Sequence, residues 1–438
     1  MSDEGKHLPG LGSSAHIGAV NEVVIESAGT LHGQLQRGLG RAARRAAATT
    51  GVAELVFDCI RRDPRWDRQV ESRALYYARL VVDLELPVGP IAEHLREPAG
   101  GDEWHGRLAV DVLADLVRLS RREAAGPLRE CAEDGEQWFE AVDALVGLRD
   151  PELAEGLDGL VVARCDDGDL DWLVADPDNP VLRAWAGRRP QIAAALGRRR
   201  PGGGTGVPRP RRQGRTGGDR SASSESELLD LARRPDDDGA VAAIFELGRR
   251  RTPALLDLAE ELLPQSDGRW GGALCRALRE YGSEALPRAR AWARAHAGCE
   301  ALALCILSRH GTHQDIPILM GELEAAVTRE AWGAAASPVE GLGRLRAGEA
   351  VPLLKKTWTD SSYSYLRPRV LTALTRTAPH TAETYAVEAL WDCEDDTRRV
   401  AVSSAPFTDD TRLRFHRLHS DPAEEPQVRA AASDRLMF

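Results

Sequence analysis

Apolar residues recur at helical spacing through most of the chain. Ala273, Leu274, Ala277 and Leu278, for example, stand at positions i, i+1, i+4 and i+5, which places them on one face of a helix. Glycine- or proline-containing turns separate successive stretches of this kind. The pattern predicts an all-α protein. No apolar run approaches the roughly 18 residues that a membrane span requires.

The second half of the chain repeats itself. Four times, a helix that ends near a glycine is followed by a second helix that opens with a proline. These prolines are Pro253, Pro287, Pro317 and Pro352, spaced 34, 30 and 35 residues apart. Proline is tolerated there because the first helical turn does not use its backbone N–H. Such a period predicts an α-solenoid, in which stacked helical hairpins share a core that one hairpin cannot bury.

The same logic continues on both sides of these four hairpins. Paired helices without the proline are expected at Val370–Ala378 with Ala386–Trp391, and at Arg398–Ser404 with Leu413–Leu418. A final half-repeat, Gln427–Leu436, would close the array. In the first half, Pro90 and Pro127 also stand at predicted helix starts, 37 residues apart. We interpret the first half as divergent repeats of the same kind.

Composition divides the chain into four parts. Residues 1–46 are expected to be a largely disordered tail with a short β segment at 16–36, and residues 47–197 a divergent helical repeat domain. Residues 198–220 hold eight arginines, seven glycines, three prolines and one acid, so 198–223 is predicted to be a flexible cationic linker. Residues 224–438 are predicted to be a second, more regular repeat domain, which opens with the capping box Ser224-x-x-Glu227.

The alternating Ala-x-x-Ala-Leu helices, with Ala-Leu-Pro or Ile-Pro at the next helix start, resemble HEAT repeats of the bacterial phycobilin-lyase-like type. The stretch Asp63–Val70, followed by Tyr76 and Tyr77, is similar to the opening of HEAT-containing proteins common in actinobacteria. The resemblance covers most of the chain. It implies a solenoid that serves as an interaction scaffold, and no assigned chemistry.

Charge and cysteine content narrow the function classes. The formal net charge is −11, which disfavours broad binding to nucleic acid or to an anionic membrane. The seven cysteines form no CxxC pair, and several lie in apolar helical stretches. They are typical of buried thiols in a reducing compartment. We therefore expect a cytoplasmic protein that needs no cofactor or metal.

Few residues suggest chemistry. His310 and His313 could form half of a metal site, but no third ligand is near in sequence. The acidic runs 166–167, 236–238 and 394–396 precede predicted helices, where carboxylates cap the first turn. Gly202–Gly204 follows no strand and is no phosphate cradle. We predict no catalytic, cofactor-binding or metal-binding residue.

Tryptophans raise a second hypothesis, that the protein is a HEAT-like nucleic-acid-binding enzyme of the DNA glycosylase type. Helix ends of successive repeats carry Trp270, Trp292, Trp332, Trp358 and Trp391. HEAT-like DNA glycosylases hold a damaged base with Trp, Asp and Arg on a concave surface, but no motif of that family can be transferred residue by residue. We interpret these tryptophans as apolar wedges between repeats.

The N-terminal segment suggests a third hypothesis, that the protein is a signalling adaptor with an N-terminal amyloid-like motif. Residues 16–25, HIGAVNEVVI, have strand composition and are followed by Gly29–Gln36. They are similar to short amyloid-type signalling motifs related to the necroptosis homotypic-interaction motif, although His16 replaces the usual Gln. Such a segment would stack in cross-β form on a partner. The leading hypothesis remains a non-enzymatic scaffold for unknown protein partners.

Overall fold

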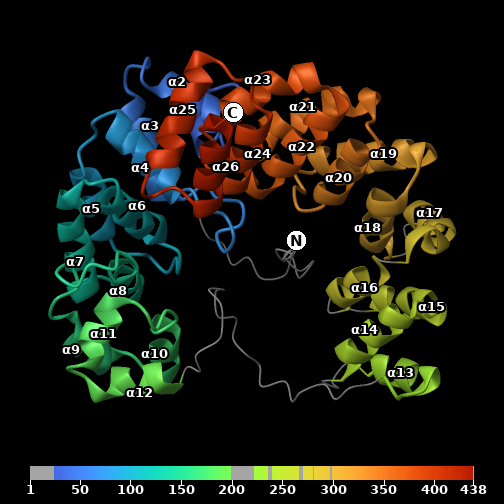
Figure 1. The fold of residues 1–438 in the computed structure, drawn as a ribbon, viewed down its shortest axis with the longest axis horizontal. Helices are drawn as coiled ribbons and strands as arrows, with labels where there is room; N and C mark the ends of the chain where they lie inside the picture. Colours follow the sequence, from blue (N-terminus) through green and yellow to red (C-terminus); the bar gives the residue numbers. More distant parts are fainter. Residues whose placement is uncertain are drawn as a thin grey trace. The chain divides into compact units, whose positions relative to one another are not determined.

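The computed structural model describes residues 24–198, 221–234, 239–265, 270–279, 281–295 and 298–437. These residues form helices, turns and short connections, and no β-strand occurs among them (Figure 1). The all-α prediction is thereby confirmed. Alanine, leucine and valine dominate the buried positions, as the low aromatic content implies. Within these residues, no helix is both long and apolar enough to cross a bilayer.

The chain divides into two compact units. Unit 1 includes Arg211–Ser361 and Thr372–Pro379, and unit 2 includes Asn21–Pro210, Ser362–Leu371 and His380–Phe438. This grouping differs from the predicted division at 198–223, because the last part of the chain groups with the first half. The predicted linker itself lies almost wholly outside the described residues.

Unit 1 is built from successive helices of the second half. They are α13 (Glu225–Ala232), α14 (Ala240–Arg250), α15 (Ala254–Leu262), α16 (Gly271–Leu278), α17 (Leu286–Ala295), α18 (Glu300–His310), α19 (Ile316–Thr328), α20 (Ala336–Arg344) and α21 (Val351–Asp360), with short 3₁₀ turns η2 (Leu263–Gln265), η3 (Gly282–Ala285), η4 (His313–Asp315) and η5 (Gly348–Ala350). Helices α14, α16, α18 and α20 pack each against the next. That alternate packing is what stacked hairpins require, while the solenoid as a whole stays a prediction.

The predicted helix starts are confirmed. Pro253 is the N-cap of α15, Pro287 is the second residue of α17, and Pro317 and Pro352 stand in the first turns of α19 and α21. Ser224 and Glu227 form the predicted capping box at α13, with Glu227 N donating to Ser224 Oγ at 3.3 Å.

Unit 2 combines the first twelve helices with the last four. They are α1 (Leu31–Gln36), α2 (Gly40–Ala46), α3 (Val52–Arg62), α4 (Ala74–Asp83), α5 (Gly89–Leu95), α6 (Arg107–Arg118), α7 (Ala125–Asp134), α8 (Trp138–Gly147), α9 (Leu157–Arg164), α10 (Asp167–Leu173), α11 (Pro180–Ala186), α12 (Pro190–Arg198), α23 (Pro379–Ala389), α24 (Asp395–Ser404), α25 (Asp409–Ser420) and α26 (Pro426–Leu436), with η1 (Arg122–Ala124) and η6 (Ser364–Leu366). Helix α22 (Arg367–Thr377) begins in unit 2 and ends in unit 1. Helix α26 confirms that the predicted closing segment, Gln427–Leu436, is helical.

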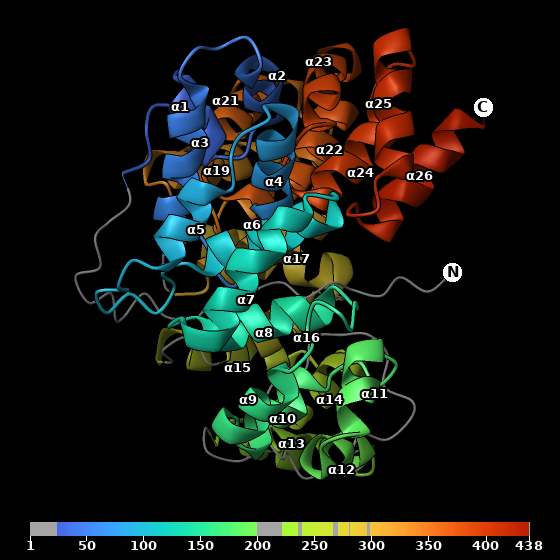
Figure 2. The same cartoon turned by 90° about the vertical axis from the view of Figure 1, so that its left-hand side faces the viewer.

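The early helices α2 and α4 lie beside the late helices α24 and α25 in unit 2, as both views show (Figures 1 and 2). Cys393 N donates to Gly38 O at 3.0 Å, and Arg41 Nε donates to Glu388 at 2.9 Å. Glycines permit this approach, since a Cβ on Gly40 would lie 2.0 Å from the backbone oxygen of Glu388. The helices nearest the N-terminus are therefore part of the core of this unit.

Two predictions about the N-terminal region are wrong. Residues 31–46 are helical in place of a disordered tail, with Leu35 and Leu39 fully buried. The predicted β segment at 16–36 is not a strand where it is described; Thr30 caps α1 by accepting from Gly33 N at 3.0 Å. Burial of the two leucines against partners distant in sequence explains the difference. Residues 16–23 of the proposed amyloid-type motif lie outside the described residues.

Candidate binding cavity and the ionic network beside it

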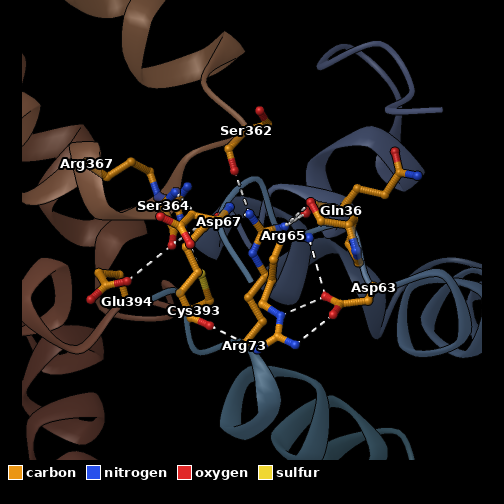
Figure 3. A network of polar contacts seen from close by, with 12 residues as sticks. Gln36, Asp63, Arg65, Asp67, Arg73, Ser362, Ser364, Arg367, Cys393 and Glu394 are labelled. Carbon is orange, nitrogen blue, oxygen red and sulfur yellow. Dashed lines mark hydrogen bonds and ion pairs between the residues drawn. The ribbon is translucent and has the colours of Figure 1, made fainter. Parts of the chain in front are cut away.

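A buried ionic network connects the early helices of unit 2 to its later segments (Figure 3). Arg73, at the start of α4, has no exposed surface. Its Nη2 donates to Glu71 Oε2 at 2.9 Å and to Ser362 O at 2.5 Å, and its Nη1 donates to Gln36 O. One guanidinium therefore links three segments that are far apart in the sequence.

Glu71 completes this connection from the other side. Its Oε2 accepts from both the backbone N and the Oγ of Ser364, at 2.7 and 2.6 Å. Burial alone would raise the pKa of Glu71, but the charge of Arg73 and the bonds from Ser364 hold it below its ordinary value. Burial likewise opposes the charged form of Arg73, yet the neighbouring Glu71 carboxylate keeps the pKa of Arg73 above its ordinary value.

Two more arginines are buried with bidentate carboxylate partners. Arg367 donates to Asp392 at 2.8 and 2.9 Å, and its Nη2 also contacts Cys393 Sγ at 2.9 Å. Arg398 donates to Glu424 at 2.8 and 2.6 Å. Burial raises and the charge of Arg398 lowers the pKa of Glu424, with a net fall to about 2. These paired, charge-assisted hydrogen bonds fix the backbone around them.

A cavity of about 820 Å³ lies beside this network in unit 2. Helices α6 and α8, the start of α24 and the segment before α26 contribute to its wall. Its carboxylates outnumber its arginines nine to five, and it has no histidine, lysine or aromatic side chain. The carboxylates are Asp111, Asp115, Glu140, Asp143, Asp176, Glu394, Asp395, Glu424 and Glu425; the arginines are Arg107, Arg118, Arg149, Arg398 and Arg429.

Several carboxylates in this cavity have unusually high pKa values. Burial between the walls, opposed by Arg65, raises the pKa of Asp111 to about 6. Burial also raises the pKa values of Asp115 and Asp143. The side chain of Asp111 still has exposed surface, because it faces the open interior of the cavity.

Asp111 and Asp143 lack direct partners. Within the part of the chain that the structure describes, neither accepts a hydrogen bond nor forms an ion pair. Asp115, in contrast, accepts from Arg118 at 2.6 Å. Two carboxylates on α6 and α8 are thus available to a ligand that brings its own positive charge.

Glu394 differs from its neighbours. Burial, together with the charge and hydrogen bond of Asp395, raises the pKa of Glu394 to about 8. The protonated form therefore dominates at neutral pH, and Glu394 Oε2 lies 3.1 Å from Ser364 Oγ. Sequence reasoning placed this residue in a capping run. It does occupy the N-cap position of α24, but its side chain caps nothing there.

Of the two remaining acidic runs, one caps a helix and the other lies outside the described residues. Asp166 caps α10 as predicted, with Asp169 N donating to it at 2.9 Å. Residues 236–238 and Gly202–Gly204 lie outside the described residues.

His310, one of the two histidines considered as half of a metal site, has a backbone partner: its Nε2 lies 2.6 Å from Arg279 O. Among described residues, the one group that could hold a metal is His94, Glu97 and His105, between α5 and α6.

Four of the five tryptophans are buried, which confirms that they pack in the interior: Trp270, Trp292, Trp332 and Trp358. Trp391 is half-buried, and the guanidinium carbons of Arg44 and Arg414 lie 5.2 and 4.9 Å from its ring centroid. All seven cysteines are free thiols, and four of them are buried. None of these residues lines the cavity except Cys393.

Sequence comparisons name no relative. The chain matches no protein-family model, and a search of curated proteins found no match. Functional argument therefore rests on the cavity and its charges. The cavity could not be predicted from the sequence because its lining residues come from segments as far apart as Ser72 and Arg429, while each acid alone resembles an ordinary surface carboxylate.

Proposed function

We propose that the protein is a non-enzymatic, cytoplasmic binding scaffold of the HEAT-like solenoid type, and that unit 2 receives a cationic segment of a protein partner in its cavity. The observation that carries the proposal is the excess of carboxylates in the lining, with Asp111 and Asp143 unpaired. An arginine or lysine side chain entering the cavity would form the ion pairs that these two residues lack.

The chemistry of the lining supports this class of ligand over nucleic acid. A groove that binds phosphates needs an excess of arginine and lysine, and a base-binding pocket needs an aromatic surface for stacking. The cavity has neither of these features. Trp391, the half-buried tryptophan, is already flanked by two arginines.

The test is binding of a fluorescent oligoarginine peptide to the full chain, followed by anisotropy. We expect saturable binding that weakens by about thirtyfold in the double variant Asp111→Asn, Asp143→Asn, since each of the two lost charge pairs contributes on the order of 1 kcal/mol. A matched control removes two charges elsewhere, at Asp167 and Asp409, whose side chains are almost fully exposed.

The controls separate site binding from general attraction to an acidic protein. The Asp167→Asn, Asp409→Asn variant is expected to bind as the unaltered chain does. Equal weakening in both double variants would refute a role for the cavity. Binding of a DNA oligonucleotide that requires Asp111 and Asp143 would favour the nucleic-acid enzyme instead.

A further inference from the structure

His94, Glu97 and His105 come together where α5 ends and α6 begins. His94 Nδ1 lies 2.9 Å from Glu97 Oε2, and the two imidazole rings lie 4.6 Å apart, centroid to centroid. One potential ligand atom from each residue lies within 4.8 Å of the other two. No other such group of three occurs within the described ranges.

The backbone of the connecting loop produces this arrangement. Gly100 and Gly101 adopt φ values of +58° and +91°, in the left-handed region that favours glycine, and the chain reverses there. The loop then returns His105 to the end of α5, where its Nε2 lies 3.1 Å from Glu97 O. Asp102, within the loop, is held by Arg68 through an ion pair of 3.4 Å.

His94 has an unsatisfied ring nitrogen. The side chain is buried, and its Nε2 has no hydrogen-bond partner. Buried polar atoms are nearly always paired, so the hydrogen bonding of this ring is incomplete. Because the two ring nitrogens point to opposite edges, an ion on the Glu97 side would bind Nδ1, with the proton on Nε2.

We propose that His94, Glu97 and His105 bind a divalent transition-metal ion, with zinc as the best fit. Two imidazoles and one carboxylate are a recurrent three-ligand zinc set, with a fourth position left for water. Ligand atoms around tetrahedral zinc lie about 3.4 Å apart. Glu97 is exposed and His105 half-buried, so both side chains can close the difference while buried His94 stays in place.

Such an ion would link the two ends of the loop between α5 and α6. Glu97 precedes this loop and His105 ends it. Arg61 is the cation whose charge acts on both His94 and Glu97. The site therefore needs its carboxylate, because two imidazoles near a guanidinium would hold a dication weakly.

The test is a zinc titration of tag-free, chelator-treated full chain by calorimetry. One ion per chain is expected. Binding should weaken by at least about tenfold in His105→Ala and in Glu97→Gln, and the zinc-dependent rise in melting temperature should disappear with it. These two variants carry the test because His94→Ala changes a buried residue and could unfold the region.

The chain offers a matched control in His380 and Glu383. They form a second histidine–carboxylate pair at i, i+3, 3.6 Å apart, without a third ligand, and His380 is fully exposed. His380→Ala should leave the zinc affinity unchanged. As a second readout, cobalt(II) should give the visible absorption of a tetrahedral site in the unaltered chain and lose it in His105→Ala. Absence of saturable binding, or equal binding by His105→Ala and the unaltered chain, would overturn the proposal.

Discussion

Glu71 and Arg73 form an ion pair in which neither side chain has exposed surface, with Arg73 Nη2 2.9 Å from Glu71 Oε2. Both residues also bind the segment that precedes α22: Glu71 accepts from Ser364, and Arg73 donates to Ser362 O. The pair is therefore the point where residues nearly 300 positions apart are joined within unit 2. Removing either partner leaves the other charge buried without its counter-charge.

The first prediction is that Glu71→Gln destabilises unit 2 strongly. Breaking a fully buried ion pair costs about 3–5 kcal/mol, because the remaining guanidinium has lost its counter-charge. Urea unfolding followed by circular dichroism measures the loss. The control is Glu130→Gln, which breaks the exposed pair with Arg96 and should cost less than about 1 kcal/mol. A loss no larger than that control would show that the network does not hold the unit together.

The second prediction concerns Glu394 and pH. The pKa of Glu394 is raised to about 8 in the folded chain by burial and by Asp395. The unfolded chain releases this proton near its ordinary pKa of about 4.3, so the folded form loses stability as pH rises from there to about 8. Glu394→Gln should remove the loss. We expect a gain of about 4–5 kcal/mol at about pH 8 and little change at about pH 4.

Melting temperatures of the two chains across this pH range provide the measurement. Gln can still donate toward Asp395 and accept from Ser364, so the hydrogen bonds of the site are retained. The same substitution at Glu383, a half-exposed surface residue, serves as the control. A Glu394→Gln curve parallel to that of the unaltered chain would contradict the raised pKa.

Local helix signals were predictable from the sequence. Prolines at helix starts, the capping box at Ser224 and the closing helix α26 all depend on residues within a few positions of one another, and all are confirmed. The burial of the tryptophans was predictable too, because large apolar side chains at helical spacing are expected on the buried face of a helix.

Long-range features were not predictable. Residues 31–46 look like a tail because their Gly, Arg and Ala content gives a weak apolar face, and their burial depends on residues near 390. The cavity and the ionic network depend on the same long-range pairing. The group of His94, Glu97 and His105 had a local signal, a histidine and a carboxylate at i, i+3, but the return of His105 depends on the backbone of the loop.

The third prediction is a pH dependence of cationic peptide binding. The pKa of Asp111 is raised to about 6, chiefly by burial, so this carboxylate becomes protonated as pH falls from about 7.5 to 5. Arginine keeps its charge over that range. Affinity for an oligoarginine peptide should therefore fall severalfold on acidification. In Asp111→Asn the fall should be smaller, and an unchanged pH profile would argue against contact between the peptide and Asp111.

The fourth prediction follows from the close approach of α2 to the segment before Trp391. A Cβ on Gly40 would lie 2.0 Å from Glu388 O, a backbone atom that cannot rotate away. Gly40→Ala should therefore push the N-terminal helices off the C-terminal ones and cost about 1–3 kcal/mol, as overpacking of a tight site does. Chemical denaturation gives the value, and hydrogen exchange should show faster exchange in α1 and α2.

Gly126 is the matched control for Gly40. It lies within α7, and an added Cβ meets no atom within 4 Å. Gly126→Ala should be neutral or stabilising by up to about 1 kcal/mol, because alanine loses less backbone entropy in a helix. If Gly40→Ala were as harmless as Gly126→Ala, the N-terminal helices would not pack on the C-terminal segment. The N-terminal residues would then be the free tail that their composition suggests.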